Sequence, residues 1–309
     1  MYQILISVCI CTYNPNEKYL NRVINSILSQ DLEKHSWEFF IVDNNSAHPV
    51  SNIDIVLQNN IKVVVEKTPG LTAARKCANN IANGDIIVFV DDDNILNPDY
   101  LSKVEYSFED KSIGILSGAI LPEYEQAPEE WFYTYEEMIA IRRLTGSSVL
   151  LNDKHVYNGR FPIGAGMAVR KMILNEYFCN HLTAANYIEG RKGNELSSGE
   201  DIDLDFFAIS IQYKIGIYPL LKMKHIIPAS RVSIEYIKRL TISSLNSSYL
   251  INQKWKVHFG ENVIDCFDLD KPAILIRLIW NMVLGSISRK KYLRFVFLKS
   301  LYKYQKALG

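Results

Sequence analysis

The segment Ile86–Asp93 (IIVFVDDD) runs from five apolar residues directly into three acids. Branched and aromatic side chains at residues 86–90 are typical of a strand that is buried on both faces. Strands of this kind form parallel sheets covered by helices, and ligands bind beyond the carboxyl ends of such strands. The three acids therefore stand where a parallel sheet would hold its binding site.

The chain on either side of this segment alternates between strand and helix patterns. Helical spacing of apolar residues predicts helices at residues 19–28 and Leu71–Ala82. Further strands are predicted from apolar runs at Ile4–Ile10, Phe39–Val42 and Ile61–Val65. This alternation predicts an α/β fold, a Rossmann-like and mostly parallel sheet with helices on both faces.

The rest of the chain is less regular. Residues 112–218 predict short strands mixed with loops, and Leu220–Lys224 predicts one more short strand. From Ser233 to the end the pattern is helical. We therefore expect residues 1–230 to form a catalytic domain and residues 231–309 to form a C-terminal helical extension.

Polar residues gather where three of the predicted strands end. They are Thr12-Tyr13-Asn14, Asp43-Asn44-Asn45 and Asp91-Asp92-Asp93-Asn94. Adjacent carboxylates raise each other's pKa unless a cation or hydrogen-bond donors compensate. A divalent ion held by one or two carboxylates and substrate phosphates is a common solution. The alternative for these acids is a solvated turn or a helix cap, and we favour the metal.

Two later segments offer further candidates. Gly199-Glu200-Asp201 opens a predicted helix, where the acids serve either as caps or, beside a metal-diphosphate site, as the source of a general base. His225 follows a predicted strand, and a lone histidine is more often structural than a ligand.

The distribution of charge along the chain indicates which partners it can bind. The 309 residues contain 34 Lys or Arg and 34 Asp or Glu, but nine of the bases and none of the acids follow Asp270. A basic terminal segment on an acidic body predicts contact with an anionic surface such as a membrane; the alternative is a terminal helix packed on the catalytic domain. The acidic body argues against nucleic-acid binding.

Sparse cysteines and the lack of a leader sequence indicate a cytoplasmic protein. The five cysteines form no CxxC pair, and no apolar run reaches the roughly 20 residues that a spanning helix needs. We therefore expect a protein in the cytoplasm that is at most peripheral on the inner face of the cytoplasmic membrane.

The ordered motifs resemble those of the family 2 inverting glycosyltransferases of the GT-A fold, of the type found in bacterial polysaccharide biosynthesis. The resemblance covers about Ile4 to Arg231. It rests on these blocks: Ile6–Asn14, Val42–Ser46, Gly70-Leu71 with Ala74-Arg75, Gly84-Asp85 before Phe89–Asp93, and Gly199–Asp201. Lys76 and Gly166 depart from the residues that the family often has at these positions.

The resemblance implies a role for each matching residue. Asp201 would be the catalytic base, with Glu200 beside it near the acceptor. Asp93, and His225 with it, would hold Mn²⁺ or Mg²⁺. The residues implied in nucleotide binding are Thr12, Tyr13, Asn14, Asp43, Arg75, Asp91 and Asp92.

The resemblance also implies the reaction. We expect a metal-dependent, inverting transfer of a hexosyl or N-acetylhexosaminyl group from a nucleotide-diphospho-sugar, with a UDP-sugar favoured. The acceptor would be a hydroxyl of a glycan or of a lipid-linked oligosaccharide in cell-surface polysaccharide synthesis. The alternatives are a polyprenyl-phosphate glycosyltransferase and a catalytically silent glycan-binding or scaffold protein.

Overall fold

The computed structural model describes residues 5–152, 161–181, 198–264 and 289–307, together with positions 155, 157, 159, 188, 190–192 and 196. The strands are β1 (Ile6–Thr12), β2 (Trp37–Asp43), β3 (Lys62–Val65), β4 (Ile86–Val90), β5 (Asn94–Leu96), β6 (Ile113–Tyr124), β7 (Leu150–Asn152), β8 (Met167–Arg170) and β9 (Lys214–Ile227). The helices are α1 (Glu17–Leu28), α2 (Asp54–Gln58), α3 (Leu71–Ile81), α4 (Tyr100–Ser107), α5 (Lys171–Glu176), α6 (Glu200–Ser210), α7 (Ile234–Phe259) and α9 (Arg289–Ala307). The 3₁₀-helices are η1 (Lys34–Ser36), η2 (Val50–Asn52), η3 (Glu130–Ile139) and η5 (Ala229–Val232), and η4 (Tyr177–His181) is a π-helix.

The strands of the described residues form one sheet in the order β3-β2-β1-β4-β8-β6-β9-β5, with β7 added beside β9. The first four strands of this order are parallel. β8 runs antiparallel between β4 and β6, and β6 and β9 are parallel again. The predicted fold class, a mostly parallel sheet, is therefore confirmed.

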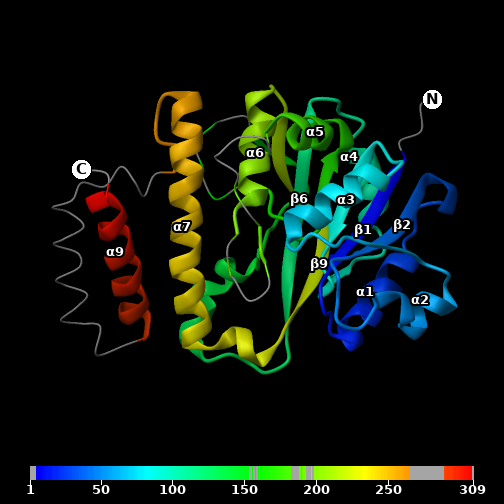
Figure 1. Cartoon of the computed structure of the whole chain (residues 1–309), viewed down its shortest axis with the longest axis horizontal. Coiled ribbons are helices and arrows are strands. Elements are labelled where there is room, and N and C mark those ends of the chain that lie inside the picture. The colour runs from blue at the N-terminus through cyan, green and yellow to red at the C-terminus, as the bar shows by residue number, and fades with distance from the viewer. Residues whose placement is uncertain are drawn as a thin grey trace.

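Helices cover both faces of the sheet, as predicted (Figure 1). Ile6, Val8 and Ile10 of β1 pack with apolar residues of α1 and α4. Cys9, which points to the other face, packs in a second cluster with residues of α3, α5 and α6. Because successive side chains of a strand point to opposite faces, one apolar strand supplies both cores.

The middle of the chain differs from its prediction. β6 has 12 residues and β9 has 14, where the pattern predicted only short strands. The two strands pair along most of their length, with a register shift between Gly118 and Ala119. A Cβ atom at Gly118 would lie 1.8 Å from the carbonyl oxygen of Leu221, so only glycine fits at this irregularity. The first eight residues of β6 are all buried, which removes the alternating pattern by which a half-exposed strand is recognised. In β9 only the part from Leu221 to His225 alternates between buried and exposed residues.

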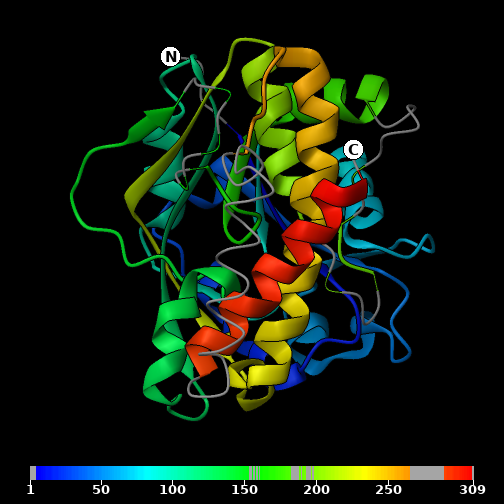
Figure 2. The ribbon, with the colours of Figure 1, turned by 90° about the vertical axis from the view of Figure 1, so that its left-hand side faces the viewer.

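The predicted C-terminal helices are present. α7 begins at the N-cap Ser233, whose hydroxyl accepts from Tyr236 N (3.2 Å), and it ends at Gly260, where φ is +82°. α9 lies along α7 (Figures 1 and 2), with Leu298 and Leu301 packed on Leu245. Residues 265–288 of the predicted helical region lie outside the described residues. No helix in the described ranges has the length and apolar character needed to cross a bilayer.

Candidate active site

A cavity of about 860 Å³ opens beyond the carboxyl ends of β1 and β4. Its wall combines residues that are far apart in the sequence, from the ends of these strands, from α3 and α6, and from β9 and α7. Most of the predicted residues line it: Thr12, Tyr13, Arg75, Asp91, Asp92, Asp93, Glu200, Asp201 and His225. The fold thus brings together the side chains that the sequence motifs singled out.

The acids after β4 are joined to the end of β1. The hydroxyl of Thr12 donates a hydrogen bond to Asp92 Oδ2. Burial, together with the charge of Asp93, raises the pKa of Asp92 to about 7. Burial and the charge of Asp93 also raise the pKa of Asp91. A cation in the cavity would therefore stabilise the ionised forms of these crowded carboxyl groups.

Asp93 is surrounded by groups from the far end of the sheet. Its Oδ2 lies 3.3 Å from His225 Nε2 and accepts a hydrogen bond from Arg231 Nη1 (3.0 Å). The side-chain amide of Asn94 donates to Asp93 Oδ1 (3.0 Å). Antiparallel pairing of β5 with β9 sets this arrangement, because Asn94 lies opposite His225 and Ile226 N donates to Asp93 O (2.8 Å).

This donor set fits a divalent ion. Two ligands of one octahedral ion, each about 2.1 Å from it, lie about 3 Å apart, close to the separation of Asp93 Oδ2 and His225 Nε2. Among the described residues no group of three or more His, Cys, Asp or Glu side chains converges on one point. Substrate oxygens and water would therefore have to supply the other ligands, as is usual for Mg²⁺ bound with phosphates.

Arg75 lies between the acids and α6. Its Nη1 donates to Glu200 Oε1 (3.1 Å), both side chains are buried, and its guanidinium lies over the ring of Phe89. Gly164 packs directly on it, since a Cβ atom at Gly164 would lie 2.4 Å from Arg75 Nη2. Glu200 is thus the counter-ion of Arg75, an arrangement that the motif did not predict.

Asp201 stands at the start of α6 on the cavity wall. Its Oδ2 accepts a hydrogen bond from Gly164 N (3.0 Å) and its Oδ1 accepts from Ile202 N (2.9 Å). Gly199, with φ at +123°, makes the turn into the helix, a conformation that favours glycine.

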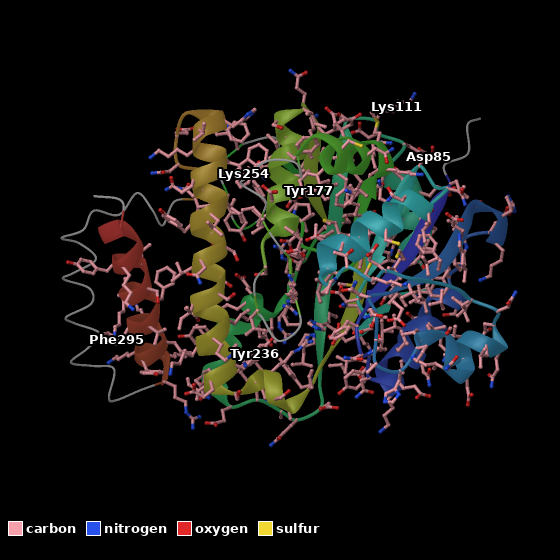
Figure 3. The ribbon with its side chains drawn as sticks, viewed as in Figure 1. Asp85, Lys111, Tyr177, Tyr236, Lys254 and Phe295 are labelled. Carbon is pink, nitrogen blue, oxygen red and sulfur yellow. The ribbon has the colours of Figure 1, made fainter. Side chains whose placement is uncertain are left out.

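Asp203, one turn into α6, fixes the helix in place. Its carboxylate accepts hydrogen bonds from Tyr177 OH, Lys254 Nζ and Trp255 Nε1, each at 2.7 Å, and it is fully buried. Lys254 lies on α7 and Tyr177 on η4 (Figure 3). The position of Asp201 therefore depends on three partners from outside its own helix.

Two predicted residues lie outside the cavity wall. Both carboxylate oxygens of Asp43 accept backbone hydrogen bonds in the following loop, from Ser46 N (2.9 Å) and Val50 N (3.1 Å). Asn14 Oδ1 accepts from Ala47 N (2.8 Å). In this structure both side chains shape the loop that follows β2.

Asn44, which follows Asp43 and has no predicted role, does line the cavity. Its Oδ1 accepts from Gly70 N (2.7 Å), and its Nδ2 donates to Glu66 O and Thr68 O. These bonds fix the start of α3, which carries Arg75. The asparagine after a strand end was visible in the sequence, but its distant partners were not.

Sequence reasoning also missed four cations on the cavity wall: Arg142, Arg191, Lys192 and Arg231. Arg231 lies six residues after His225, and its place beside Asp93 depends on the turn η5 between β9 and α7. No local pattern distinguishes it from a surface arginine.

Comparison with known proteins identifies the family of the chain. The sequence model of glycosyl transferase family 2 matches residues 7–178, more than half of the chain. This matched region contains Arg75 and the acids after β4, and it ends before Asp201 and His225. An uncharacterized glycosyltransferase of Methanocaldococcus jannaschii is 26% identical over 275 residues, which are 84% of this chain and 83% of that protein.

A second relative is the poly(ribitol-phosphate) beta-N-acetylglucosaminyltransferase TarS of Staphylococcus aureus. It is 31% identical over 99 residues, 31% of this chain, and the match spans only 17% of TarS. The structure of Staphylococcus aureus TarS with UDP-GlcNAc has a TM-score of 0.50 at 18% identity, covering 99% of this chain and 91% of that one. GalNAc-T7 with UDP, GalNAc and Mn²⁺ has a TM-score of 0.54 at 15% identity, over 82% and 50% of the two chains. At these identities the two structures show a shared GT-A fold.

Proposed function

The chain belongs to glycosyl transferase family 2, and on this premise we propose that it transfers a sugar from a nucleotide-diphospho-sugar, a UDP-sugar first of all, to a hydroxyl group. The transferred group would be a hexosyl or N-acetylhexosaminyl unit, and the configuration at its anomeric carbon would invert. One observation carries the proposal. A single cavity combines the acids at residues 91–93 and the cation Arg75 with a carboxylate, Asp201, whose backbone partners hold it on the wall.

Residues of the chain would act on both reacting groups, the acceptor hydroxyl and the leaving diphosphate. In the proposal Asp201 accepts the proton of the acceptor hydroxyl as the hydroxyl attacks, a contribution typically worth about 10²–10⁴-fold in rate. Arg75 contacts the diphosphate side of the cavity, where a guanidinium forms strong charge-assisted hydrogen bonds. A divalent ion held by Asp93 and His225 would neutralise the charge that develops on the leaving diphosphate.

Similarity supports the choice of donor and metal. TarS was solved with UDP-GlcNAc, and GalNAc-T7 with UDP, GalNAc and Mn²⁺. We therefore propose UDP as the nucleotide and Mn²⁺ or Mg²⁺ as the ion.

The acceptor and the place of action follow by the same reasoning. TarS acts on poly(ribitol-phosphate), as its name states, so we propose a glycan or lipid-linked acceptor in cell-surface polysaccharide synthesis. We also propose that the enzyme works at the inner face of the cytoplasmic membrane. The exposed cations of α9, among them Lys290, Arg294, Lys299 and Lys303, would each add about 1 kcal/mol of attraction to an anionic leaflet. Because the leucines of α9 pack on α7, the contact with the membrane would be made by these cations.

The domain division belongs to the proposal as well. Residues 1–230 would form the catalytic unit, and residues 231–309 would form the helical region, whose first helix, α7, closes one side of the cavity.

Release of nucleoside diphosphate tests the function. The purified protein is incubated with UDP-GlcNAc, UDP-glucose and GDP-mannose in the presence of Mn²⁺, with and without glycan acceptors, and the released diphosphate is measured. We expect release from a UDP-sugar that an acceptor accelerates. A protein that binds UDP but releases none with any donor or acceptor would instead be a silent binding protein.

A further inference from the structure

Arg231 occupies the space between the two groups that would hold a divalent ion. Its Nη1 lies 3.0 Å from Asp93 Oδ2 and 3.2 Å from His225 Nε2, and these two atoms lie 3.3 Å from each other. One nitrogen of the guanidinium thus closes a triangle with the carboxylate and the imidazole.

Arg231 and a divalent ion cannot both bind His225 Nε2 at the same time. A guanidinium has donors only, so wherever Arg231 Nη1 hydrogen-bonds His225 Nε2, the imidazole is in the tautomer whose Nε2 accepts. A neutral imidazole has one nitrogen that accepts, and the single lone pair of this nitrogen is also the one that binds a metal. The Nε2 lone pair that faces Arg231 therefore cannot bind an ion until the guanidinium moves away.

We propose that Arg231 is a positioning residue that takes the place of the divalent cation between Asp93 and His225 and must leave both before the cation binds. The inference rests on the proposed function, because it takes Asp93 and His225 as the ligands of the ion. It goes beyond that function by giving Arg231 a role that opposes metal binding in the free enzyme.

The surroundings of Arg231 suit such an exchange. Asp91, Asp92 and Asp93 concentrate negative charge in the cavity, so a cation from the chain stabilises the acids while no metal is present. Arg231 lies on the short turn η5, and 26% of its side chain is exposed, against 9% for Asp93 and 7% for His225. Arg231 is therefore the most exposed of the three groups and is the one that moves in the proposed exchange.

The exchange has a thermodynamic consequence. A cation that must displace Arg231 binds the free enzyme less tightly than its two ligands would otherwise allow, because binding selects the minor arrangement of the side chain. Metal alone would then bind weakly, and nucleotide and metal would bind tightly only together.

The affinity for Mn²⁺ alone tests the proposal, with the free ion measured by electron paramagnetic resonance and no nucleotide present. Arg231→Gln removes the guanidinium, and we expect it to tighten Mn²⁺ binding by about tenfold or more relative to the wild type, within the usual range for coupled sites. Arg191→Gln is the matched control. Arg191 lines the same cavity and carries the same charge, so its loss reports the effect of charge alone, and we expect a change below about threefold.

Three outcomes would overturn the proposal: unchanged or weaker Mn²⁺ binding by Arg231→Gln, no measurable Mn²⁺ binding by this variant, or an equal gain in both variants. If Arg231→Gln does not fold, Arg231→Met, which keeps an unbranched apolar stem, takes its place with the same expectation. Calorimetric binding of UDP by the same preparations separates the two claims. Unchanged Mn²⁺ affinity with intact UDP binding refutes the role of Arg231 alone, whereas a wild type that binds no nucleotide refutes the proposed function.

Discussion

The guanidinium of Arg75 lies 3.1 Å from the carboxylate of Glu200, and both side chains are buried although 125 positions separate them in the sequence. The pair joins α3, which packs on the sheet, to the first turn of α6, where Asp201 stands. Removal of one partner from a buried ion pair leaves an uncompensated charge and is strongly destabilising. This contact therefore fixes the position of α3 relative to the first turn of α6 in the cavity wall.

Gly164→Ala tests the place of Arg75. A Cβ atom would lie 2.4 Å from Arg75 Nη2, so we expect the guanidinium to be displaced and UDP affinity to fall about tenfold, while overpacking costs roughly 1–3 kcal/mol of stability. Calorimetry with UDP and thermal unfolding measure the two effects. Unchanged UDP affinity would show that Arg75 takes no part in nucleotide binding.

Asp201→Asn tests the proposed base. The amide keeps the shape of the carboxylate but cannot accept the proton, so we expect transfer to slow by about 10²–10⁴-fold while UDP affinity stays within about threefold. Steady-state kinetics and calorimetry are the measurements. Glu200→Gln is the contrasting variant, because loss of the charge that faces Arg75 should weaken both UDP binding and stability. Loss of UDP binding in Asp201→Asn would contradict the assignment.

Asp203→Ala tests the anchor of α6. Loss of this buried carboxylate leaves Lys254, Tyr177 and Trp255 without their common acceptor, so we expect the free energy of unfolding to fall by about 3–5 kcal/mol. Asp31→Ala, at an exposed position, should change it by no more than about 0.5 kcal/mol. Urea unfolding of both variants measures these changes. If Asp203→Ala loses as little stability as Asp31→Ala, Asp203 does not anchor α6.

Asp205 gives a pH-dependent prediction. It is fully buried, its carboxyl oxygens have no hydrogen-bond partner among the residues that the structure describes, and burial raises its pKa well above the ordinary 3.8. The folded state therefore keeps a proton that the unfolded chain releases above pH 3.8, and the stability present below this value is lost as pH rises. Asp205→Asn carries no such cost. The stability of Asp205→Asn relative to the wild type should therefore grow as pH rises above 3.8, by up to about 1.4 kcal/mol per pH unit for as long as the folded protein keeps this proton.

Urea unfolding of the wild type and Asp205→Asn at pH 5, 6 and 7 measures this difference. A difference that stays constant over this range would mean that Asp205 is ionised in the folded protein. Asp31→Asn, which makes the same change at an exposed position, is the control.

The sequence was sufficient where local pattern governs the structure. The apolar run before Asp91 predicted β4 and placed the acids at the edge of the sheet, and the spacing of residues 71–82 predicted α3 to within one residue. It was insufficient for the full length of β6 and β9, because the first eight residues of β6 and residues 215–219 of β9 are buried and show no alternation. It was also insufficient for Arg231, whose position follows from the pairing of β5 with β9 and from a turn that no motif signals.

Calorimetric titration with UDP, GDP, CDP and dTDP, with and without Mn²⁺, of the wild type and of Asp93→Ala decides whether this cavity binds a nucleotide-sugar. We expect that UDP binds best, that Mn²⁺ tightens its binding, and that Asp93→Ala abolishes the tightening without unfolding the protein. If no nucleotide binds to the wild type under any of these conditions, the account of this cavity as a nucleotide-sugar site is wrong.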